Sequence, residues 1–387
     1  MIRTSALIPA IALLAACSSG GGNAQANQTA ARETPSISPV DGPPFVATAI
    51  ATFAEPWAMA FLPGGTQALI TERKGVLKLW TVGGGAVDVA GVPAVDYGGQ
   101  GGLGDVVLHP DFAQNGLVYL SYAEAGEGDI RGAAVARGKL VVAADGSAKL
   151  TGVRTLWRQS AKVEGRGHFG HRLAFAPDGH LFLSSGERQQ FDPAQDMASN
   201  LGKVLRLNDD GSVPKDNPFA DKGGVTAQIW SLGHRNPLGL AFDAAGRLWE
   251  IEMGPKGGDE LNRIEPAKNY GYPIVSNGDH YDGKDIPDHD TRPEFAAPAV
   301  SWTPVISPAD LIFYSGDLFP DWKGSAFIPG LSSKAIVRVT FKGDTAKEAQ
   351  RFPMGARIRE VKQGPDGALW VLEDGAQGRL LKLTPRG

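Results

Sequence analysis

A two-strand unit recurs along this chain and constrains its fold more than any other feature. Each copy consists of alternating apolar residues, a turn rich in Pro, Asp and Gly, and a second apolar strand. The six copies begin at Ala58, Asp105, Arg172, Leu238, Asp310 and Glu360. Their spacing of roughly fifty to seventy-five residues is close to or above the blade repeat of β-propellers. The pattern predicts an all-β chain folded as a six-bladed β-propeller of four-stranded antiparallel blades. The alternative, a large β-sandwich, does not predict six related hairpins.

The composition supports many tight turns and excludes one class of partner. The chain has 387 residues, among them 51 Gly and 27 Pro, and both residue types favour turns over long helices. The net charge is -4, whereas a nucleic-acid-binding surface needs an excess of basic residues. We therefore expect no nucleic-acid partner.

The first residues indicate export and a lipid anchor. A short apolar run follows Arg3, and it is too short to span a bilayer, which is typical of a secretory signal. The run ends in the lipobox pattern LAAC, whose Cys17 is the only cysteine of the chain. Ser18 resembles the residue that follows the cysteine in outer-membrane lipoproteins. We therefore expect a periplasmic protein that is attached to the outer membrane only through lipid on Cys17. The expected segments are a signal peptide with the lipidated cysteine (1–17), a flexible linker (18–44) and the propeller domain (45–387).

Two histidines stand directly before the first strand of the third hairpin, in the segment GHFGHRLAFAPDG. A Gly-rich turn at a strand entrance places His168 at the mouth of the propeller channel, where a neutral imidazole suits a general base. We expect His171 to point to the other face, because side chains alternate along a strand. Metal binding by the pair is the less favoured alternative, since no third histidine or cysteine has ligand spacing.

The segment IWSLGHRNPLGLAFDAAGRLWEIEMGP joins a polar cluster, Arg235-Asn236, to a Gly254-Pro255 turn through one hairpin. Adjacent strands place both ends at one cavity. A cation, an amide and turn carbonyls together suit an anionic, metal-bound cofactor. The segment GPKGGDELN adds carboxylates, including Glu260, and such hard oxygen ligands suit Ca²⁺.

Further cations and a glycine-rich loop complete the candidate site. Arg357 and Arg359 share one strand face, and with Arg235 they suit a ligand that carries several carboxylates. The alternative for this pair is a solvated edge strand. Gln100 lies between glycines in DYGGQGGLGDVVLHPDF, where the backbone can approach a ligand closely, unless the segment is only a loop between blades.

Taken together, these segments resemble the soluble sugar dehydrogenases that use pyrroloquinoline quinone (PQQ), in particular the bacterial aldose sugar dehydrogenases. The matching strings follow the family's order, from PWAMAFLPGG and GGQGGLGDVVLHPDF through GHFGHRLAFAPDG, NLGKVLRLNDDGSVPKDNPF, IWSLGHRNPLGLAFD, MGPKGGDELN and KNYGYP to RIREVKQGPDGALWVLEDG. They cover about residues 45–385.

The resemblance implies a reaction and a role for each matching residue. An aldose is oxidised at its anomeric carbon to the lactone, with His168 as the base and hydride transfer to the quinone. Arg235 stabilises the charge on the reduced cofactor, and the electrons pass to an acceptor that the sequence does not identify. The positions that match cofactor-binding residues are Gln100, Arg235, Asn236, Tyr281, Arg357 and Arg359. The positions that match calcium ligands are Gly254 and Pro255 under the quinone, and Glu260 and Tyr270 at a second, structural site.

Two positions depart from the family pattern. Glu187 stands where the family commonly has Asp in support of the histidine. Ser332 stands where the family often has Lys, and Lys334, two residues later on the same face of a strand, is our candidate replacement in cofactor binding.

Two other functions are compatible with a propeller. A calcium-dependent hydrolase such as a lactonase needs carboxylates that converge on a central metal. A non-catalytic propeller needs no catalytic residues at all, and fold alone does not distinguish it from an enzyme. The clustered arginines and His168 favour the dehydrogenase.

Overall fold

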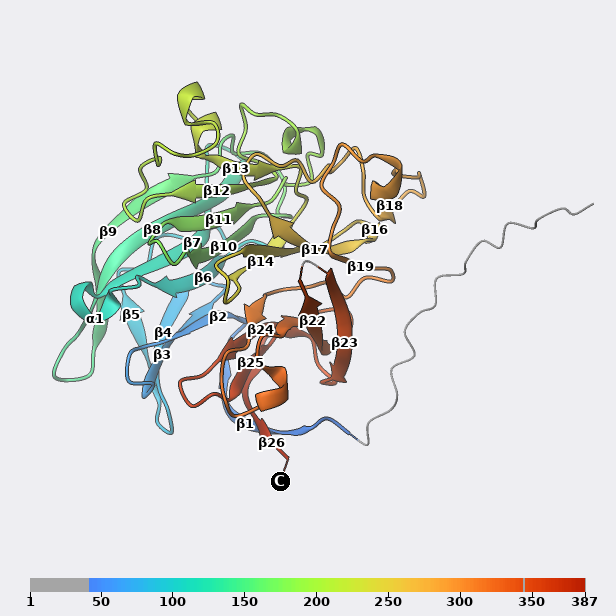
Figure 1. Cartoon of the computed structure of the whole chain (residues 1–387). Helices are drawn as coiled ribbons and strands as arrows, with labels where there is room; N and C mark the ends of the chain where they lie inside the picture. Colours follow the sequence, from blue (N-terminus) through green and yellow to red (C-terminus); the bar gives the residue numbers. More distant parts are fainter. Residues whose placement is uncertain (1–41, 344, 387) are drawn as a thin grey trace, which may run out of the picture. The chain divides into compact units, whose positions relative to one another are not determined.

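The computed structural model describes residues 42–343 and 345–386 (Figure 1). The predicted signal peptide, the lipid attachment at Cys17 and most of the predicted linker lie outside the described residues. Within the described residues, no helix is long and apolar enough to cross a membrane.

The largest sheet contains the strands β2 to β9 (Figure 1). Their bounds are β2 (Pro56–Phe61), β3 (Gln67–Glu72), β4 (Val76–Thr81), β5 (Ala86–Ala90), β6 (Leu103–Leu108), β7 (Leu117–Ala125), β8 (Arg131–Val142) and β9 (Ala148–Arg158), with helix α1 (Phe112–Asn115) between β6 and β7. Two antiparallel runs, β2 to β5 and β6 to β9, join because β5 and β9 pair in parallel at Val89–Ala148 and Ala90–Lys149. The all-β prediction is confirmed, but the prediction of four-stranded blades is not, since this sheet has eight strands.

The other large sheets are antiparallel and four-stranded. The third hairpin begins the sheet of β10 (Gly170–Phe175), β11 (Leu181–Ser185), β12 (Lys203–Leu207) and β13 (Ile229–Leu232). The fourth begins that of β14 (Pro237–Phe242), β15 (Leu248–Glu252), β17 (Asp259–Ile264) and β19 (Val300–Trp302). The fifth begins that of β20 (Ile312–Phe313), β21 (Ala326–Pro329), β22 (Ala335–Lys342) and β23 (Thr345–Pro353). The last contains β24 (Ile358–Gln363), β25 (Leu369–Glu373), β26 (Gly378–Pro385) and β1 (Phe45–Phe53).

Short elements fill the connections. The strands β16 (Lys256–Gly257) and β18 (Gly278–Asp279) form a small separate pair. The 3-10 helices are η1 (Asp192–Ala194), η2 (Ala220–Lys222), η3 (Thr226–Gln228), η4 (His289–Thr291) and η5 (Pro320–Trp322). In the last sheet, β1 pairs with β26. The first described strand therefore joins the three last strands of the chain in one sheet.

The six predicted hairpins are confirmed, because each is an antiparallel pair that opens a run of strands. Glycines in equivalent turns adopt positive φ: Gly179 at 88°, Gly246 at 74° and Gly367 at 78°. Only glycine takes this conformation without a steric cost, so the Asp-Gly-like turns of the sequence determine where each hairpin reverses.

The first strands of the hairpins form a closed ring. Among the described strands, β2 contacts β6, and contacts continue from β6 to β10, β14, β20 and β24 and back to β2. The buried apolar side chains of the described residues form six clusters, and each cluster fills the space between neighbouring runs of strands. The core is therefore distributed around the ring, and burial of these faces holds neighbouring runs together.

Arg172 of β10 lies at the centre of this ring and is 1% exposed. Its guanidinium donates hydrogen bonds to the carbonyl oxygens of Leu238, at 2.8 Å, and Ala309, at 2.6 Å. It stacks over the ring of Trp57 at 3.9 Å. Its carboxylate partners are Asp105 at 3.3 Å, Glu360 at 3.4 Å and Asp310 at 3.8 Å. This one side chain thus contacts residues on or beside all the inner strands.

The charges around Arg172 are balanced by a second cation and one protonated acid. The Nζ atom of Lys362 lies 3.4 Å from Asp310 and 3.2 Å from Glu360. Burial raises the pKa of Glu360 to about 8, so this carboxyl is mostly protonated at neutral pH. Two cations then face the carboxylates of Asp105 and Asp310, as a buried ionic cluster requires.

We predict that Arg172→Leu lowers the free energy of unfolding by about 3–5 kcal/mol, because it leaves buried carboxylates without their cation. Urea denaturation followed by tryptophan fluorescence measures the change. The matched control is Arg154→Leu at an exposed position, which we expect to change stability by less than about 0.5 kcal/mol. Equal stability of the two variants would contradict a central role for Arg172.

Candidate active site

Three cavities that share lining residues bring most of the predicted site residues together beside the first residues of the inner strands. The main cavity, of about 250 Å³, is lined by Gln100, Asn236, Arg357 and Arg359 among others. A second, narrow cavity is lined by Arg235, Gly254, Pro255, Glu260 and Tyr270. The third, of about 220 Å³, is lined by His168, Arg235, Pro255 and Tyr281. Met253 lines the first two cavities, and Arg235 lines the last two.

His168 stands in a turn just before β10 with a φ of 46°. Its backbone N–H donates to Gln100 Oε1 at 2.8 Å, and its Nδ1 bonds Glu187 Oε1. With the proton on Nδ1, the Nε2 lone pair remains available. Burial lowers the pKa of His168 below its ordinary value, although the hydrogen bond to Glu187 raises it in part. A neutral imidazole beside a cavity can act as a general base.

Glu187 supports His168 despite its extra methylene. It is fully buried, and its second oxygen accepts the backbone N–H of Phe191 at 2.8 Å. Burial raises the pKa of Glu187, but His168 and Phe191 outweigh burial and hold it below its ordinary value. The departure from Asp therefore leaves the carboxylate–imidazole contact intact.

His171 has different surroundings from His168. Its Nδ1 lies 2.7 Å from Ser121 Oγ, and its ring stacks on Trp57 at 5.2 Å. Burial lowers the pKa of His171 to about 3, so the ring is neutral. It lies where the pairing of β10 with β11 shifts register between Gly170 and Leu173. Strand alternation therefore does not determine its direction, and it lines the main cavity.

Arg235 connects the cavities. Its backbone N–H donates to Glu252 Oε2 at 2.5 Å, and its Nη1 donates to the carbonyl oxygens of Met253, at 3.0 Å, and Gly254, at 2.7 Å. Its buried Nε has no partner among the described residues. Asn236 is held next to it, because its Oδ1 accepts the backbone N–H of Gly170 at 3.3 Å. A buried donor without a partner suits an anionic ligand.

Arg357 and Arg359 bind the same carboxylate and therefore point to the same side. Strand alternation does not explain this, because Arg357 precedes β24 and Arg359 lies at its register shift. Arg357 Nε donates to Asp374 Oδ2 at 2.7 Å, and Arg359 Nη2 donates to Asp374 Oδ1 at 2.7 Å. Burial raises the pKa of the Asp374 carboxyl, but the arginines outweigh burial and hold it below its ordinary value. The pair retains a net positive charge at the main cavity.

The residues predicted to bind calcium lie along the second cavity. The Gly254 N–H donates to Asp259 Oδ1 at 2.9 Å, which fixes the orientation of the Gly254-Pro255 turn. The Tyr270 carbonyl oxygen lies 3.1 Å from His289 Nε2, and Glu260 Oε1 lies 3.7 Å from His289 Nδ1. Burial, and then the charge of Glu252, raise the pKa of Glu260 well above its ordinary value.

Two of the predicted cofactor-binding residues, Tyr281 and Lys334, are exposed. Tyr281 is 73% exposed, and its ring lies 5.9 Å from the Arg235 guanidinium. Lys334 is exposed, has a φ of 50° in the turn before β22, and is not among the residues that line the main cavity. The argument from strand alternation does not apply to Lys334, because Ser332 and Lys334 are not in a strand.

Sequence reasoning missed residues that the fold adds to these cavities: Trp57, Phe191, Tyr272 and Asp374. The place of Asp374 in the site could have been predicted from the sequence, because Asp374 follows the second strand of the last hairpin and therefore lies near Arg357. The stack of Phe191 on Tyr272, at 6.3 Å between ring centroids, joins distant loops and leaves no local pattern.

Comparisons with known proteins agree with this geometry. The family model for glucose/sorbosone dehydrogenases matches residues 53–382. The aldose sugar dehydrogenase YliI of Escherichia coli K12 is 43% identical over 339 residues, which cover 86% of this chain and 90% of that protein. The chain belongs to the glucose/sorbosone dehydrogenase family.

Solved structures extend this family assignment. The apo-form of the soluble aldose sugar dehydrogenase from Escherichia coli has a TM-score of 0.83 and 41% identity, over 88% of this chain and all of that one (100%). The PQQ-bound aldose sugar dehydrogenase from Streptomyces coelicolor has a TM-score of 0.72 and 28% identity, over 89% of this chain and 100% of that one. The resemblance inferred from the sequence is confirmed, and so is an oxidoreductase that acts on sugars.

For this family member we predict that the acid limb of kcat/KM for sugar oxidation is centred below pH 6.5. Protonated His168 cannot accept a proton, and burial holds its pKa below 6.5. Glu187→Gln removes the charge that raises this pKa, so the acid limb moves to still lower pH. Steady-state pH profiles of both proteins measure the shift. A wild-type limb centred above pH 6.5 would contradict the assignment of His168 as the base.

Proposed function

We propose that this protein oxidises aldose sugars at the anomeric carbon to lactones, with PQQ and Ca²⁺ as cofactors, on a six-bladed propeller. In this interpretation the eight-stranded sheet represents two blades joined at β5 and β9. The observation that carries the proposal is the contact of His168 with Glu187 beside the same cavity as the buried guanidinium of Arg235.

The residues present fit an anionic quinone. Arg235 offers a buried Nε donor without a partner among the described residues, and Arg357 and Arg359 add positive charge at the main cavity. We propose that these arginines hold the carboxylates of PQQ, with Gln100 and Asn236 beside them. Tyr281 is the aromatic residue at the cofactor side. Lys334 stays a weaker proposal, because its exposed turn lies outside the lining of this cavity.

The oxygen donors along the second cavity fit calcium. The carbonyl groups of Gly254 and Pro255 are proposed to hold one ion beside the cofactor, and Glu260 with Tyr270 a second, structural ion. Carbonyl and carboxylate oxygens are the ligands that Ca²⁺ prefers.

The side chains at the site have separate roles in the proposed reaction. When bound, PQQ supplies the acceptor for the hydride of the sugar. His168 Nε2 accepts the proton of the anomeric hydroxyl, and Glu187 stabilises the resulting imidazolium. Arg235 places positive charge where negative charge develops. Loss of the hydroxyl proton and of the hydride from the anomeric carbon yields the lactone, and an external acceptor then takes the electrons.

We predict that apoprotein, mixed with PQQ, Ca²⁺ and an aldose, reduces a redox dye, and that removal of the quinone or chelation of the cation abolishes this activity. His168→Ala should still bind PQQ, followed by its absorbance, but should turn over about a hundred- to ten-thousand-fold more slowly, as expected for loss of a general base. Turnover that survives both quinone removal and chelation would contradict the proposed function. Normal turnover by His168→Ala would contradict only the assignment of the base.

We also propose that Cys17 carries lipid and anchors the mature protein in the periplasm, at the outer membrane. The lipobox pattern LAAC supports this location. We predict that wild-type protein fractionates with membranes and that Cys17→Ser remains unprocessed or becomes soluble, because the anchoring acyl chains are lost. Metabolic labelling with palmitate and membrane fractionation test this. Unchanged processing and fractionation of Cys17→Ser would exclude the anchor.

A further inference from the structure

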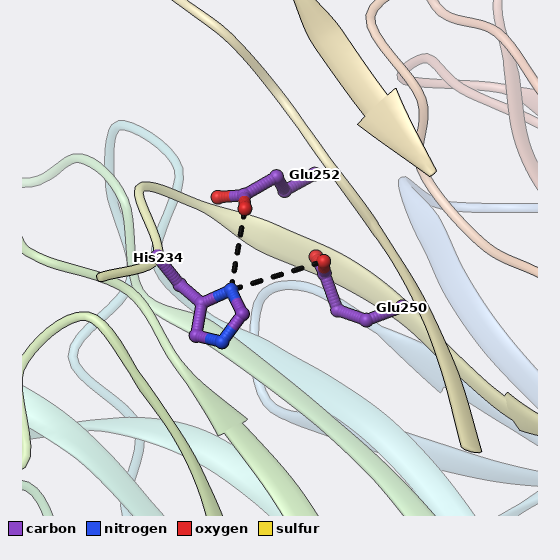
Figure 2. A group of neighbouring side chains, drawn as sticks. All are labelled: His234, Glu250 and Glu252. Carbon is purple, nitrogen blue, oxygen red and sulfur yellow. Dashed lines mark hydrogen bonds and ion pairs between the residues drawn. The ribbon is translucent and has the colours of Figure 1, made fainter. Parts of the chain in front are cut away.

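A fully buried group of polar side chains lies behind Arg235, outside the roles proposed above. It contains His234, Glu250, Glu252 and Asn262, which are 0%, 0%, 4% and 0% exposed. Figure 2 shows the His234 ring with Nδ1 directed toward both carboxylates. Nδ1 lies 3.2 Å from Glu252 Oε1 and 3.9 Å from Glu250 Oε2.

Strand register brings these acids together on one face. In the antiparallel pair of β15 and β17, Glu250 lies opposite Asn262 and Glu252 lies opposite Glu260. Glu250 and Glu252 lie two residues apart on the same face of β15, and buried carboxylates within 4.8 Å of each other repel. An arrangement of this kind needs a proton or a cation between the carboxylates.

The surroundings of His234 are compatible with a metal ion at this position. The Nε2 atom lies 2.8 Å from Ser231 Oγ, and Tyr270 stacks on the ring at 4.8 Å. Metal-binding histidines usually donate their other ring N–H to such an oxygen, which fixes the ring and presents a lone pair to the metal. In the tautomer that carries its proton on Nε2 and donates it to Ser231 Oγ, the Nδ1 lone pair faces the carboxylates.

Unpaired atoms provide an independent indication of a missing ligand. Among the described residues, Glu250 Oε1 and Asn262 Oδ1 are buried and have no hydrogen-bond partner. Asn262 is directed into the group, because its Nδ2 donates to Glu250 Oε2 and Glu252 Oε1, each at 3.2 Å. Rotation of this amide by half a turn exchanges its atoms and presents Oδ1, a ligand atom, in place of Nδ2.

We infer that His234, Glu250, Glu252 and Asn262 bind a divalent transition-metal ion of the class of Mn²⁺ and Zn²⁺. This ion is additional to the proposed calcium ions and adjoins them, because Glu252 lines the same narrow cavity as Glu260 and Tyr270. The ligand atoms of His234, Glu250 and Glu252 lie within 4.8 Å of one another. Ligands about 2.1 Å from a tetrahedral ion stand about 3.4 Å apart, close to the separations observed here. An imidazole nitrogen with carboxylates suits these metals better than Ca²⁺, which prefers oxygen ligands alone.

The site has a direct connection to the active site. Glu252 accepts the backbone N–H of Arg235 at 2.5 Å, so an ion that fixes Glu252 also fixes the backbone that carries the Arg235 guanidinium. We therefore assign the ion a positioning role behind the cavity and no contact with the sugar. This inference does not depend on the proposed function.

The test uses the full chain, stripped with a chelator and then loaded separately with Mn²⁺, Zn²⁺ or Ca²⁺. After removal of free ions, elemental analysis gives the metal retained, and thermal unfolding gives the stabilisation that binding provides. We expect wild type to retain Mn²⁺ or Zn²⁺ in the presence of competing Ca²⁺. His234→Gln and Glu250→Gln should bind the transition metal about tenfold or more weakly, and the surface control Glu265→Gln should match wild type.

Two results would show that the proposed metal site does not exist. Wild type that retains neither Mn²⁺ nor Zn²⁺, or variants that retain as much as the control, would overturn the site. If the variants fail to fold, crystals of metal-loaded wild type decide the question. An anomalous difference peak between His234, Glu250 and Glu252 supports the site, and its absence refutes it. Because metal content is measured without sugar or quinone, the result is independent of dehydrogenase activity.

Discussion

The buried guanidinium of Arg172 is the interaction on which the rest of the structure depends. A charged group at the centre of a protein is tolerated only when its donors and its charge are matched. The inner strands meet that requirement together: Leu238 and Ala309 provide carbonyl oxygens, and Asp105, Asp310 and Glu360 provide carboxyl groups. Each strand is therefore positioned with respect to a shared partner as well as to its neighbours.

The active-site cavities are a consequence of how the inner strands begin. The pairing of β2, β6, β10, β14 and β24 with their hairpin partners shifts register near the first residues of each strand. Such bulges redirect side chains and interrupt pairing. His171 and Arg359 lie in these irregular positions and line the main cavity. The regular part of each strand builds the ring, and the irregular part builds the site.

Opposite charges on the two sides of Arg235 give the site its electrostatic character. Arginines face the cavities, while the buried acids Glu250, Glu252 and Glu260 lie behind the loop that carries Arg235. Positive charge suits an anionic ligand on one side, and the acids suit cations on the other. The loop between them is held by Glu252, so an anion bound on one side and a cation bound on the other would act on the same backbone.

The sequence by itself determined the hairpins and predicted most of the residues that line the cavities, whereas the tertiary structure decided how they meet. Alternation and turn glycines such as Gly179 are local, so the six hairpins were predictable from short segments. Gln100, His168, Arg235, Asn236 and Gly254 were predictable because they lie in family strings beside strand ends. The contact of Arg172 with every inner strand, the pairing of β5 with β9, and the meeting of His234 with Glu250 and Glu252 join residues distant in sequence. Local periodicity does not encode these contacts, because they depend on register shifts and on the packing of whole sheets. The direction of His171 and the placement of Lys334 were decided in the same way, since neither residue follows strand alternation.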